Sequence, residues 1–431
     1  MPPINSNTSL SLTRRNFLKM SGAGFAALGA MRPSRLMGAI PAADRFVIDV
    51  PQATLDRIRQ RVADAVLADP IPGETNAMGP TAAYMQDLRT HWLNAYDWRA
   101  TERRINRFDH YRAEIEGEAL HYIVEEGSGP NPRRLLLLHG WPHNFISFLD
   151  IIEPLAHPER FGGRVEDAFT VVVPSFPGTG FSDKPATPLG PKAIGVRLHT
   201  LMTEVLGFDR YMMQGGDWGA LVASWMAVGA PNEVEAIHLN HLLLRPEGAW
   251  LGSGQLGKIP DPSEEERAFV AAEAAAFASP TASYFPMQSA RPQSIAHALA
   301  DSPMGSAAWY ADKFLQWVDT SQRTATDIID HDTLLDQVMV NLVTGTDDTA
   351  LWIYHGAALE MPWTLPERVK VEVPTGFAAF PDPFIAPPPR SLAERSYNVT
   401  WWREETEGGH WPMIERADLF VDSLRQFART L

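Results

Sequence analysis

Cysteine is absent from all 431 residues of the sequence. Disulfide bridges, thiolate catalysis and cysteine-ligated metal sites are therefore excluded. Positive charge is also scarce, since the formal net charge is −15, and this argues against nucleic acid or an anionic membrane surface as a partner. Internal repeats and low-complexity runs are missing as well. The residues that are present, 45% hydrophobic and 21% charged, can bury a large core in one elaborated domain or two.

The first residues are typical of a targeting segment. Thr13–Lys19 contains a pair of adjacent arginines, and Met20–Met31 is a short, mildly apolar stretch rich in glycine and alanine. That stretch is too short to span a bilayer comfortably. We therefore predict that residues 1–43 are a twin-arginine signal peptide that engages the Tat export machinery, which would make the mature protein periplasmic or secreted. A disordered basic tail is the alternative.

The remaining chain is predicted to be an α/β protein with a mostly parallel, doubly wound sheet. Two of its strand candidates, Arg134–Leu138 and Phe169–Pro174, are continuous apolar runs rather than alternating, as expected for parallel strands covered on both faces. Helical patterns separate them, which favours a sheet with helices on both sides. The expected core strands are Arg134–Leu138, Phe169–Pro174, the strand that runs into Asp217, Val234–Asn240, Val371–Phe380 and Tyr397–Trp402.

An extension and an insertion are expected around this core. The core itself is assigned to residues 129–243 and 367–431, an N-terminal extension to residues 44–128, and a helical lid to residues 244–366, where strand patterns stop. A lid inserted there would cover the carboxyl ends of the strands, where open α/β sheets bind ligands. The extension's expected elements are strands Phe46–Pro51 and Ala119–Glu125 and helices Ala53–Leu67 and Thr81–Tyr96. The other expected helices are Pro262–Phe277, Arg291–Trp317, Asp332–Val343, Thr349–Glu360 and the final Met413–Leu431.

The stretch from Gly215 to Gly219 is typical of a sharp turn between a strand and a helix. Its central residue, Asp217, stands where α/β-hydrolases carry the serine of their nucleophile elbow. The flanking glycines let the backbone turn tightly and leave the residue between them at a helix N-terminus, where free N–H groups and the helix dipole favour a carboxylate. The alternative is an aspartate that only caps the helix.

Three candidate catalytic residues follow one another in the order used by an α/β-hydrolase. Asp217 comes first, then Asp382, then His410 in a Gly-Gly-His loop, which is the order of nucleophile, acid and base. A carboxylate can attack an electrophilic sp3 carbon without prior deprotonation and so form an alkyl-enzyme ester. The histidine would then activate water to hydrolyse the ester, while an acid fixes the imidazole tautomer. The backbone N–H groups of Trp141 and Trp218 are the expected oxyanion hole.

The chain carries a set of motifs that together resemble one family. They are Tyr96–Arg99 and Asn106, His139–Pro142, Gly178–Ser182, Gly216–Gly219, Ala290–Gln293, Asp301–Pro303, Lys313–Phe314, Pro374–Phe377, Phe380–Pro381 and Gly408–His410. In these motifs the chain resembles epoxide hydrolases of the microsomal and juvenile-hormone type, an α/β-hydrolase branch with an N-terminal extension. The resemblance covers nearly everything after residue 44.

This resemblance implies a reaction and assigns residues to it. The reaction is the hydrolysis of a small hydrophobic epoxide to a vicinal diol, with water as the other reactant and without a cofactor or a metal. By motif position, Asp217 matches the family nucleophile and His410 the base, while Tyr284 and Tyr354 match the lid tyrosines that hydrogen-bond the epoxide oxygen. Phenols suit that role because they can donate to a developing alkoxide and deliver a proton to it.

The sequence departs from the family pattern at two places. The family acid stands two residues after the Phe-Pro dipeptide, which is Pro383 here; we assign the role to Asp382, one place earlier, with Glu404 and Glu405 as alternatives. The second departure is that Glu407 and Trp411 stand where the family carries a basic residue and Phe, and the Glu407 carboxylate is expected near the base. There it would favour the protonated imidazole and shift the pH optimum.

Two other functions remain open at this point. A haloalkane dehalogenase shares the aspartate elbow and the ester intermediate, but its halide needs N–H donors from Trp or Asn side chains. The sequence has Trp141 where an Asn would support that function, and the tyrosine pair argues against it. A hydrolase-fold protein that binds a ligand without turnover is the other alternative, and the displaced acid is the feature that favours it.

Overall fold

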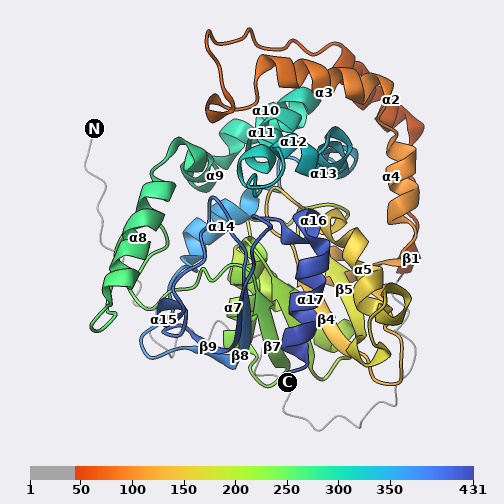
Figure 1. Ribbon diagram of the computed structural model, residues 1–431. Helices are drawn as coiled ribbons and strands as arrows, with labels where there is room; N and C mark the ends of the chain where they lie inside the picture. The colour runs from red at the N-terminus through yellow and green to blue at the C-terminus, as the bar shows by residue number, and fades with distance from the viewer. Residues whose placement is uncertain (1–43) are drawn as a thin grey trace. The chain divides into compact units, whose positions relative to one another are not determined.

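The computed structural model describes residues 44–431 (Figure 1). The predicted twin-arginine signal peptide, residues 1–43, lies outside the described residues. Among residues 44–431, helices that combine the length and the apolar character needed to cross a membrane are absent.

A nine-stranded sheet organises the described chain, in the order β1-β2-β3-β5-β4-β6-β7-β8-β9. The strands from β5 through β9 pair in parallel, whereas β1, β2 and β3 form an antiparallel edge. Both the predicted strands of the core and the α/β class are confirmed. The bounds are β1 Asp44–Phe46, β2 His110–Ile115, β3 Glu118–Glu125, β4 Arg133–Leu138, β5 Phe169–Pro174, β6 Tyr211–Gly215, β7 Val234–Leu239, β8 Val371–Ala379 and β9 Tyr397–Glu404.

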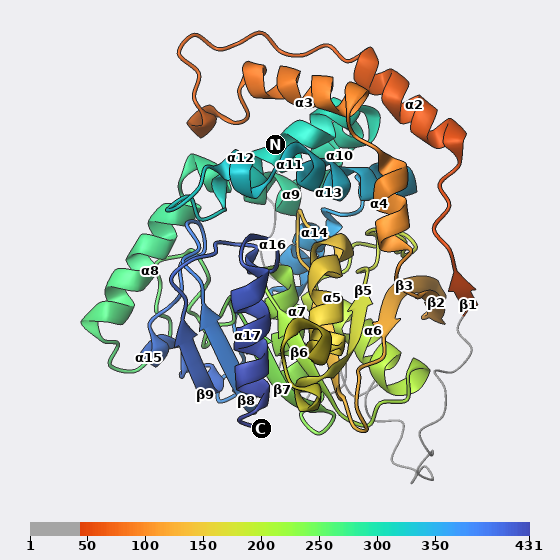
Figure 2. The same cartoon turned by 45° about the vertical axis from the view of Figure 1, so that its right-hand side comes forward.

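Helices cover both faces of this sheet, so it is doubly wound. Helices α5 (Leu149–Ala156) and α17 (Ala417–Ala428) pack against each other in front of the strands in Figure 2. Helices α6 (Pro191–Thr200) and α7 (Trp218–Gly229) pack together on the other face, and α7 contacts the central strands β4, β6, β7 and β8. Nearly every residue of α7 is buried, because the helix is apolar all round and enclosed between the sheet and α6.

The segment between β7 and β8 is helical, and we call its helices α8 to α14 the lid helices. The sequence predicts one helix over Arg291–Trp317, and this prediction is wrong, because the chain breaks at Ser302 into α10 and α11. Pro303 has no N–H and disfavours helical backbone at the residue before it. Ser302 instead caps α11 by accepting a hydrogen bond from the N–H of Gly305. The bounds are α8 Glu264–Phe277, α9 Tyr284–Ala290, α10 Pro292–Asp301, α11 Pro303–Gln316, α12 Ala325–Ile328, α13 His331–Thr344 and α14 Trp352–Glu360.

The N-terminal helices lie over the lid helices rather than on the sheet (Figures 1 and 2). Helices α2 (Gln52–Ala63) and α3 (Ala82–Asn94) pack on α11 and α13, and α4 (Trp98–Ile105) also reaches α13. A buried carboxylate of α13 supplies the polar part of this contact. Asp336 accepts hydrogen bonds from Thr101 Oγ1 at 2.6 Å and from the hydroxyl of Tyr96 at 2.8 Å. The extension therefore braces the lid.

The predicted strand Phe46–Pro51 is wrong beyond its first residue, Phe46. Strand β1 ends at Phe46, and the next backbone N–H groups find side chains instead of a neighbouring strand. The N–H of Ile48 donates to Asn106 Oδ1 at 3.0 Å, and that of Val50 donates to Glu102 Oε1 at 2.8 Å. Buried backbone N–H groups need hydrogen-bond acceptors, and here these side chains take the place of a neighbouring strand.

Candidate active site

The strand-to-helix turn at Asp217 is strained in the way that a nucleophile elbow requires. Its backbone has φ 50° and ψ −132°, a conformation that non-glycine residues rarely adopt. The turn sits tightly against strand β4, because a Cβ on Gly219 would lie 2.2 Å from the carbonyl oxygen of Leu138. The result is a buried carboxylate directly before the first residue of α7.

The loop after β4 brings a backbone donor to this carboxylate. The N–H of Trp141 donates to Asp217 Oδ1 at 2.9 Å. This close approach requires glycine at position 140, since a Cβ there would lie 2.1 Å from the same oxygen. Trp218 is the first residue of α7, where a backbone N–H has no partner within its own helix. Both predicted oxyanion-hole residues thus lie next to Asp217, and Oδ2 is the oxygen that the Trp141 N–H does not contact.

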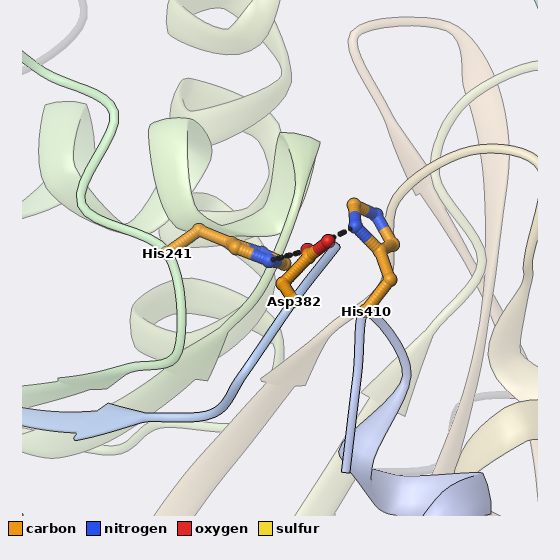
Figure 3. Close-up of side chains that lie close together, drawn as sticks. All are labelled: His241, Asp382 and His410. Atoms are coloured by element: carbon orange, nitrogen blue, oxygen red, sulfur yellow. Dashed lines mark hydrogen bonds and ion pairs between the residues drawn. The ribbon is translucent and has the colours of Figure 1, made fainter. Parts of the chain in front are cut away.

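The other two predicted catalytic residues meet beside the elbow (Figure 3). Asp382 Oδ2 accepts a hydrogen bond from His410 Nδ1 at 2.6 Å, and His410 Nε2 faces Asp217 Oδ2 at 3.4 Å. Asp382 reaches this position because its own N–H donates to the carbonyl oxygen of Phe380 in a tight turn. Its Oδ1 then accepts the N–H groups of Phe384 and Ile385 at 2.7 and 3.0 Å.

The structure does not bring the two alternative acids to the histidine. Glu404 is exposed at the end of β9, and the Glu405 carboxylate pairs with Arg403. Asp382 is therefore the carboxylate that contacts His410, although it stands one place earlier than the family pattern.

Two buried carboxylates keep His410 protonated in the unreacted protein. Burial opposes a charged imidazole, but the carboxylates of Asp382 and Asp217 outweigh it and raise the pKa of His410 to about 10. Burial likewise opposes ionisation of Asp382, yet His410 and His241 hold the pKa of that carboxyl well below its usual value. The pKa of Asp217 is also lowered, despite burial, by His410, His143 and the Trp141 N–H. At neutral pH the site contains an imidazolium between two carboxylates.

The loop that carries His410 is held through its backbone. The N–H of His410 donates to the carbonyl oxygen of Trp317 at 3.0 Å, which ties the loop to the end of lid helix α11. Glu415, which is buried, accepts the N–H groups of Gly409 at 2.9 Å, Trp411 at 3.0 Å and Asp319 at 2.8 Å. Glu415 was not among the predicted site residues, and its position a few residues after the Gly-Gly-His loop is the sequence signal that could have indicated it.

The prediction that Glu407 lies near the base is wrong. Its carboxylate is paired with the guanidinium of Arg416 and is 42% exposed. Changing Glu407 to Gln should therefore leave the pH dependence of kcat/KM within about 0.2 pH unit of the wild type, because a screened surface charge interacts weakly with a buried group. A displacement of a full pH unit, measured on the folded variant, would restore the original expectation.

The two predicted lid tyrosines lie over the elbow. Tyr284 begins α9 and Tyr354 lies in α14; both are buried, their rings are 5.7 Å apart, and each ring lies 5.5 Å from that of Trp141. Burial, reinforced by the negative charge of Asp217, raises the pKa of both phenols well above the usual value. Both therefore keep their protons and can act as hydrogen-bond donors.

A cavity of about 20 Å³ connects these tyrosines to Asp217. It has room for about one water molecule, so lid side chains must separate before an organic substrate enters. Aromatic and aliphatic side chains form the rest of its wall: Trp218, Leu221, Leu243, Leu251, Phe277, Phe285, Trp363, Phe384 and Ile385. The wall favours an apolar ligand with one polar centre facing the tyrosines.

A histidine that the sequence analysis did not single out completes the polar surroundings. His241 follows strand β7, and its Nε2 lies 2.8 Å from Asp382 Oδ2, the same oxygen that His410 contacts (Figure 3). Its Nδ1 accepts the backbone N–H of Asp217 at 2.7 Å. The signal that could have found it is a polar residue at the carboxyl end of a parallel strand.

His241, Asp382 and His410 also form a group whose ligand atoms lie within 4.8 Å of one another, close enough to hold a metal ion. Their separations of 2.6 and 2.8 Å are those of charge-assisted hydrogen bonds. Two imidazole N–H groups directed at one carboxylate oxygen account for the arrangement fully.

The fold and this site define an α/β-hydrolase, and the family model "alpha/beta hydrolase fold" matches residues 133–383. The model "Epoxide hydrolase N terminus" matches residues 43–148. A relative in Stigmatella aurantiaca, described as a candidate epoxide hydrolase, is 35% identical over 90% of this chain and 84% of its own length. Epoxide hydrolase 1 of Sus scrofa is 29% identical over 89% of this chain and 87% of its own.

A solved structure agrees with these sequence matches. The Aspergillus niger epoxide hydrolase superposes with a TM-score of 0.76 at 28% identity, covering 91% of this chain and 97% of that one. The chain belongs to the epoxide hydrolase family, in the branch that carries the N-terminal extension. The predicted resemblance and fold class are thereby confirmed.

Proposed function

We propose that this enzyme converts a hydrophobic epoxide to a vicinal diol through an ester on Asp217. The observation that carries the proposal is the pair of buried, protonated phenols of Tyr284 and Tyr354 above a carboxylate whose Oδ1 is held by the Trp141 N–H. This arrangement offers a nucleophile on one side of a small cavity and two acids on the other.

In the first step, Asp217 Oδ2 attacks an epoxide carbon and the ring C–O bond breaks. The oxygen released by this bond receives a proton from a tyrosine hydroxyl, which compensates the developing alkoxide. The ester that forms no longer carries the negative charge of Asp217. Because that charge is one of the causes that raise the pKa of His410, ester formation lowers the basicity of the imidazole. His410 can then give up its proton, which replaces the one lost by the tyrosine.

In the second step, neutral His410 takes a proton from water, and the hydroxide attacks the ester carbonyl carbon. The oxyanion forms on Oδ1, which is already within hydrogen-bond distance of the Trp141 N–H. Collapse breaks the bond between that carbon and the diol oxygen, and this oxygen takes the proton of the added hydroxyl, so that the diol leaves neutral. Asp217 is again a carboxylate and His410 an imidazolium, so the cycle closes.

A haloalkane dehalogenase would use the same ester, and the tyrosines distinguish the two reactions. A halide leaves as a stable anion and needs no proton, whereas an epoxide oxygen does. The other alternative, a binding protein without turnover, depended on a displaced acid, and the 2.6 Å contact between Asp382 and His410 removes its support.

Changing both Tyr284 and Tyr354 to Phe should abolish the opening of an aryl epoxide, and each single change should slow it by about 100-fold. The measurement is diol formation by the purified protein, with release of halide from a haloalkane of similar size followed in parallel. Tyr122→Phe is the matched control, since the hydroxyl of this buried tyrosine makes no hydrogen bond within residues 44–431. Two results together would assign the site to dehalogenation: a wild type that forms no diol, and a double variant that still releases halide.

We also propose that residues 1–43 direct export by the twin-arginine route, which would make the mature protein periplasmic or secreted. The adjacent Arg14 and Arg15 ahead of a short apolar stretch support this. Changing both arginines to lysine should leave the protein unprocessed in the cytoplasm of a Tat-competent bacterial host, as judged by cell fractionation and intact mass. Unchanged processing and distribution of the double variant would contradict the proposal.

A further inference from the structure

The candidate triad is part of a closed ring of hydrogen-bonding groups. His410 faces the Asp217 carboxylate and donates to Asp382, while His241 approaches the same oxygen of Asp382 and accepts the backbone N–H of Asp217. The nucleophile is therefore linked to the acid twice: its carboxylate faces His410 Nε2 at 3.4 Å, and its backbone N–H is hydrogen-bonded to His241. Figure 3 shows both histidines directed at the acid, and their rings lie 4.6 Å apart.

The hydrogen bonds determine the protonation state of His241. Its Nδ1 accepts an N–H and so carries no proton, which leaves the proton on Nε2, directed at Asp382. Burial keeps the imidazole neutral by lowering the pKa of His241, although its hydrogen bond to Asp382 works in the other direction. His241 is thus a neutral histidine, fixed in one tautomer, that bonds the backbone of Asp217 through one ring nitrogen and the carboxylate of Asp382 through the other.

We propose that His241 is a positioning residue of the reaction, with a separate task at each ring nitrogen. Through Nδ1 it fixes the strained backbone of Asp217 for the attack on the epoxide. Through Nε2 it shares Asp382 Oδ2 with His410, which limits how strongly the acid holds the proton of the base. This proposal rests on the proposed function of the site.

The task at Nδ1 follows from the strain of the elbow. Asp217 has a positive φ, and its N–H is buried beside the glycine turn. Without an acceptor, this N–H would be a buried unsatisfied donor and the strained conformation would lose a contact that holds it. The Asp217 carboxylate would then shift relative to the Trp141 N–H, and the attack would slow.

The task at Nε2 follows from the shared oxygen. A second N–H donor on Asp382 Oδ2 draws negative charge away from His410, so the imidazolium is less stabilised than it would be by an unshared carboxylate. The other charged or titratable groups facing this cluster are Asp217, His143, Tyr284 and Glu415. Removing the Nε2–H donor should therefore make His410 harder to deprotonate once the ester has formed.

Two substitutions separate the tasks, because amide side chains match one ring nitrogen each. His241→Asn places an acceptor near the position of Nδ1 and removes the donor to Asp382. His241→Gln places a donor near the position of Nε2 and removes the acceptor for the Asp217 N–H. His238→Asn is the matched control, since His238 is another buried histidine, within the strand β7 that precedes His241, and contacts Ser423 instead of the triad.

The experiment is single-turnover kinetics of each folded variant with an aryl epoxide, in which ester formation and ester hydrolysis are followed separately by quenched-flow mass spectrometry. His241→Asn should form the ester at nearly the wild-type rate. Its hydrolysis at pH 7 should be about 10-fold slower and should recover at higher pH, with the acid limb displaced upward by about one pH unit. His241→Gln should show the converse behaviour. It should form the ester about 10-fold more slowly, and the pH profile of ester hydrolysis should be unchanged.

Each outcome decides the proposal. Equal losses in both steps for both variants, or wild-type rates and pH profiles, would overturn it. If the variants do not fold, histidine nitrogen NMR of the wild type decides instead: a neutral Nε2–H tautomer for His241 across the active pH range is expected, and a protonated ring would contradict the assignment. Failure of the proposed function looks different, because the wild type itself would then form no ester with the epoxide.

Discussion

Replacing His410 with glutamine should leave a protein that opens one epoxide per active site and then stops. Attack by Asp217 on an epoxide carbon needs no general base, because the carboxylate is already ionised. Hydrolysis of the ester does need one, since His410 Nε2 is the group that faces Asp217 Oδ2, at 3.4 Å. Turnover should fall by about 1,000-fold or more, while the intact mass of the protein rises by the mass of one epoxide.

This experiment has an internal control in the exposed His297 of α10, whose change to glutamine should leave turnover and mass unaffected. A His410→Gln variant that still turns over at a tenth of the wild-type rate would show that another group activates the water. A folded variant that gains no mass would show that the ester does not form.

Changing Asp217 to Ala should remove the chemistry altogether. The carboxylate is the only proposed nucleophile, and its position in the strained elbow has no substitute nearby, so a loss of at least about 10,000-fold in kcat is expected. The variant should take up no epoxide mass, alone or combined with His410→Gln. Because the strained φ is costly for any side chain other than glycine, the stability of the variant is checked by thermal unfolding.

Asp209→Asn is the matched control for this change, since Asp209 is an exposed acid just before β6, the strand that leads into Asp217. It should behave as the wild type. An Asp217→Ala protein that retains more than about a hundredth of the activity would mean that water attacks the epoxide directly, without an enzyme-bound ester.

Local sequence was enough to predict the parts of the fold and site that local chemistry determines. Strands β4 and β5 followed from their continuous apolar runs, and the elbow followed from glycines on either side of Asp217, whose φ of 50° is the strain expected there. The break between α10 and α11 could also have been predicted, because Pro303 signals a helix boundary. The apolar pattern that continues across it favoured a single helix instead.

Other features depend on contacts between distant segments, and these could not be predicted from local patterns. The bond between His241 and Asp382 joins residues 141 positions apart, and that between Thr101 and Asp336 spans 235. Asp382 can replace the acid expected one residue later because its backbone N–H bonds the carbonyl oxygen of Phe380 and closes a tight turn. That turn could not be predicted from the sequence. For Glu407, proximity in sequence suggested a contact with the base that the structure does not have. Its carboxylate pairs with Arg416 instead.

The fate of oxygen in a single turnover tests the central claim, the ester on Asp217, most directly. Wild-type enzyme in excess over an aryl epoxide is allowed one turnover in water labelled with oxygen-18. Hydrolysis at the ester carbonyl sends the oxygen of water into the Asp217 carboxylate, so the first diol should be unlabelled and the peptide that contains Asp217 should gain one heavy oxygen. A labelled diol with an unlabelled peptide would contradict the account, because it would mean that water attacks the epoxide itself.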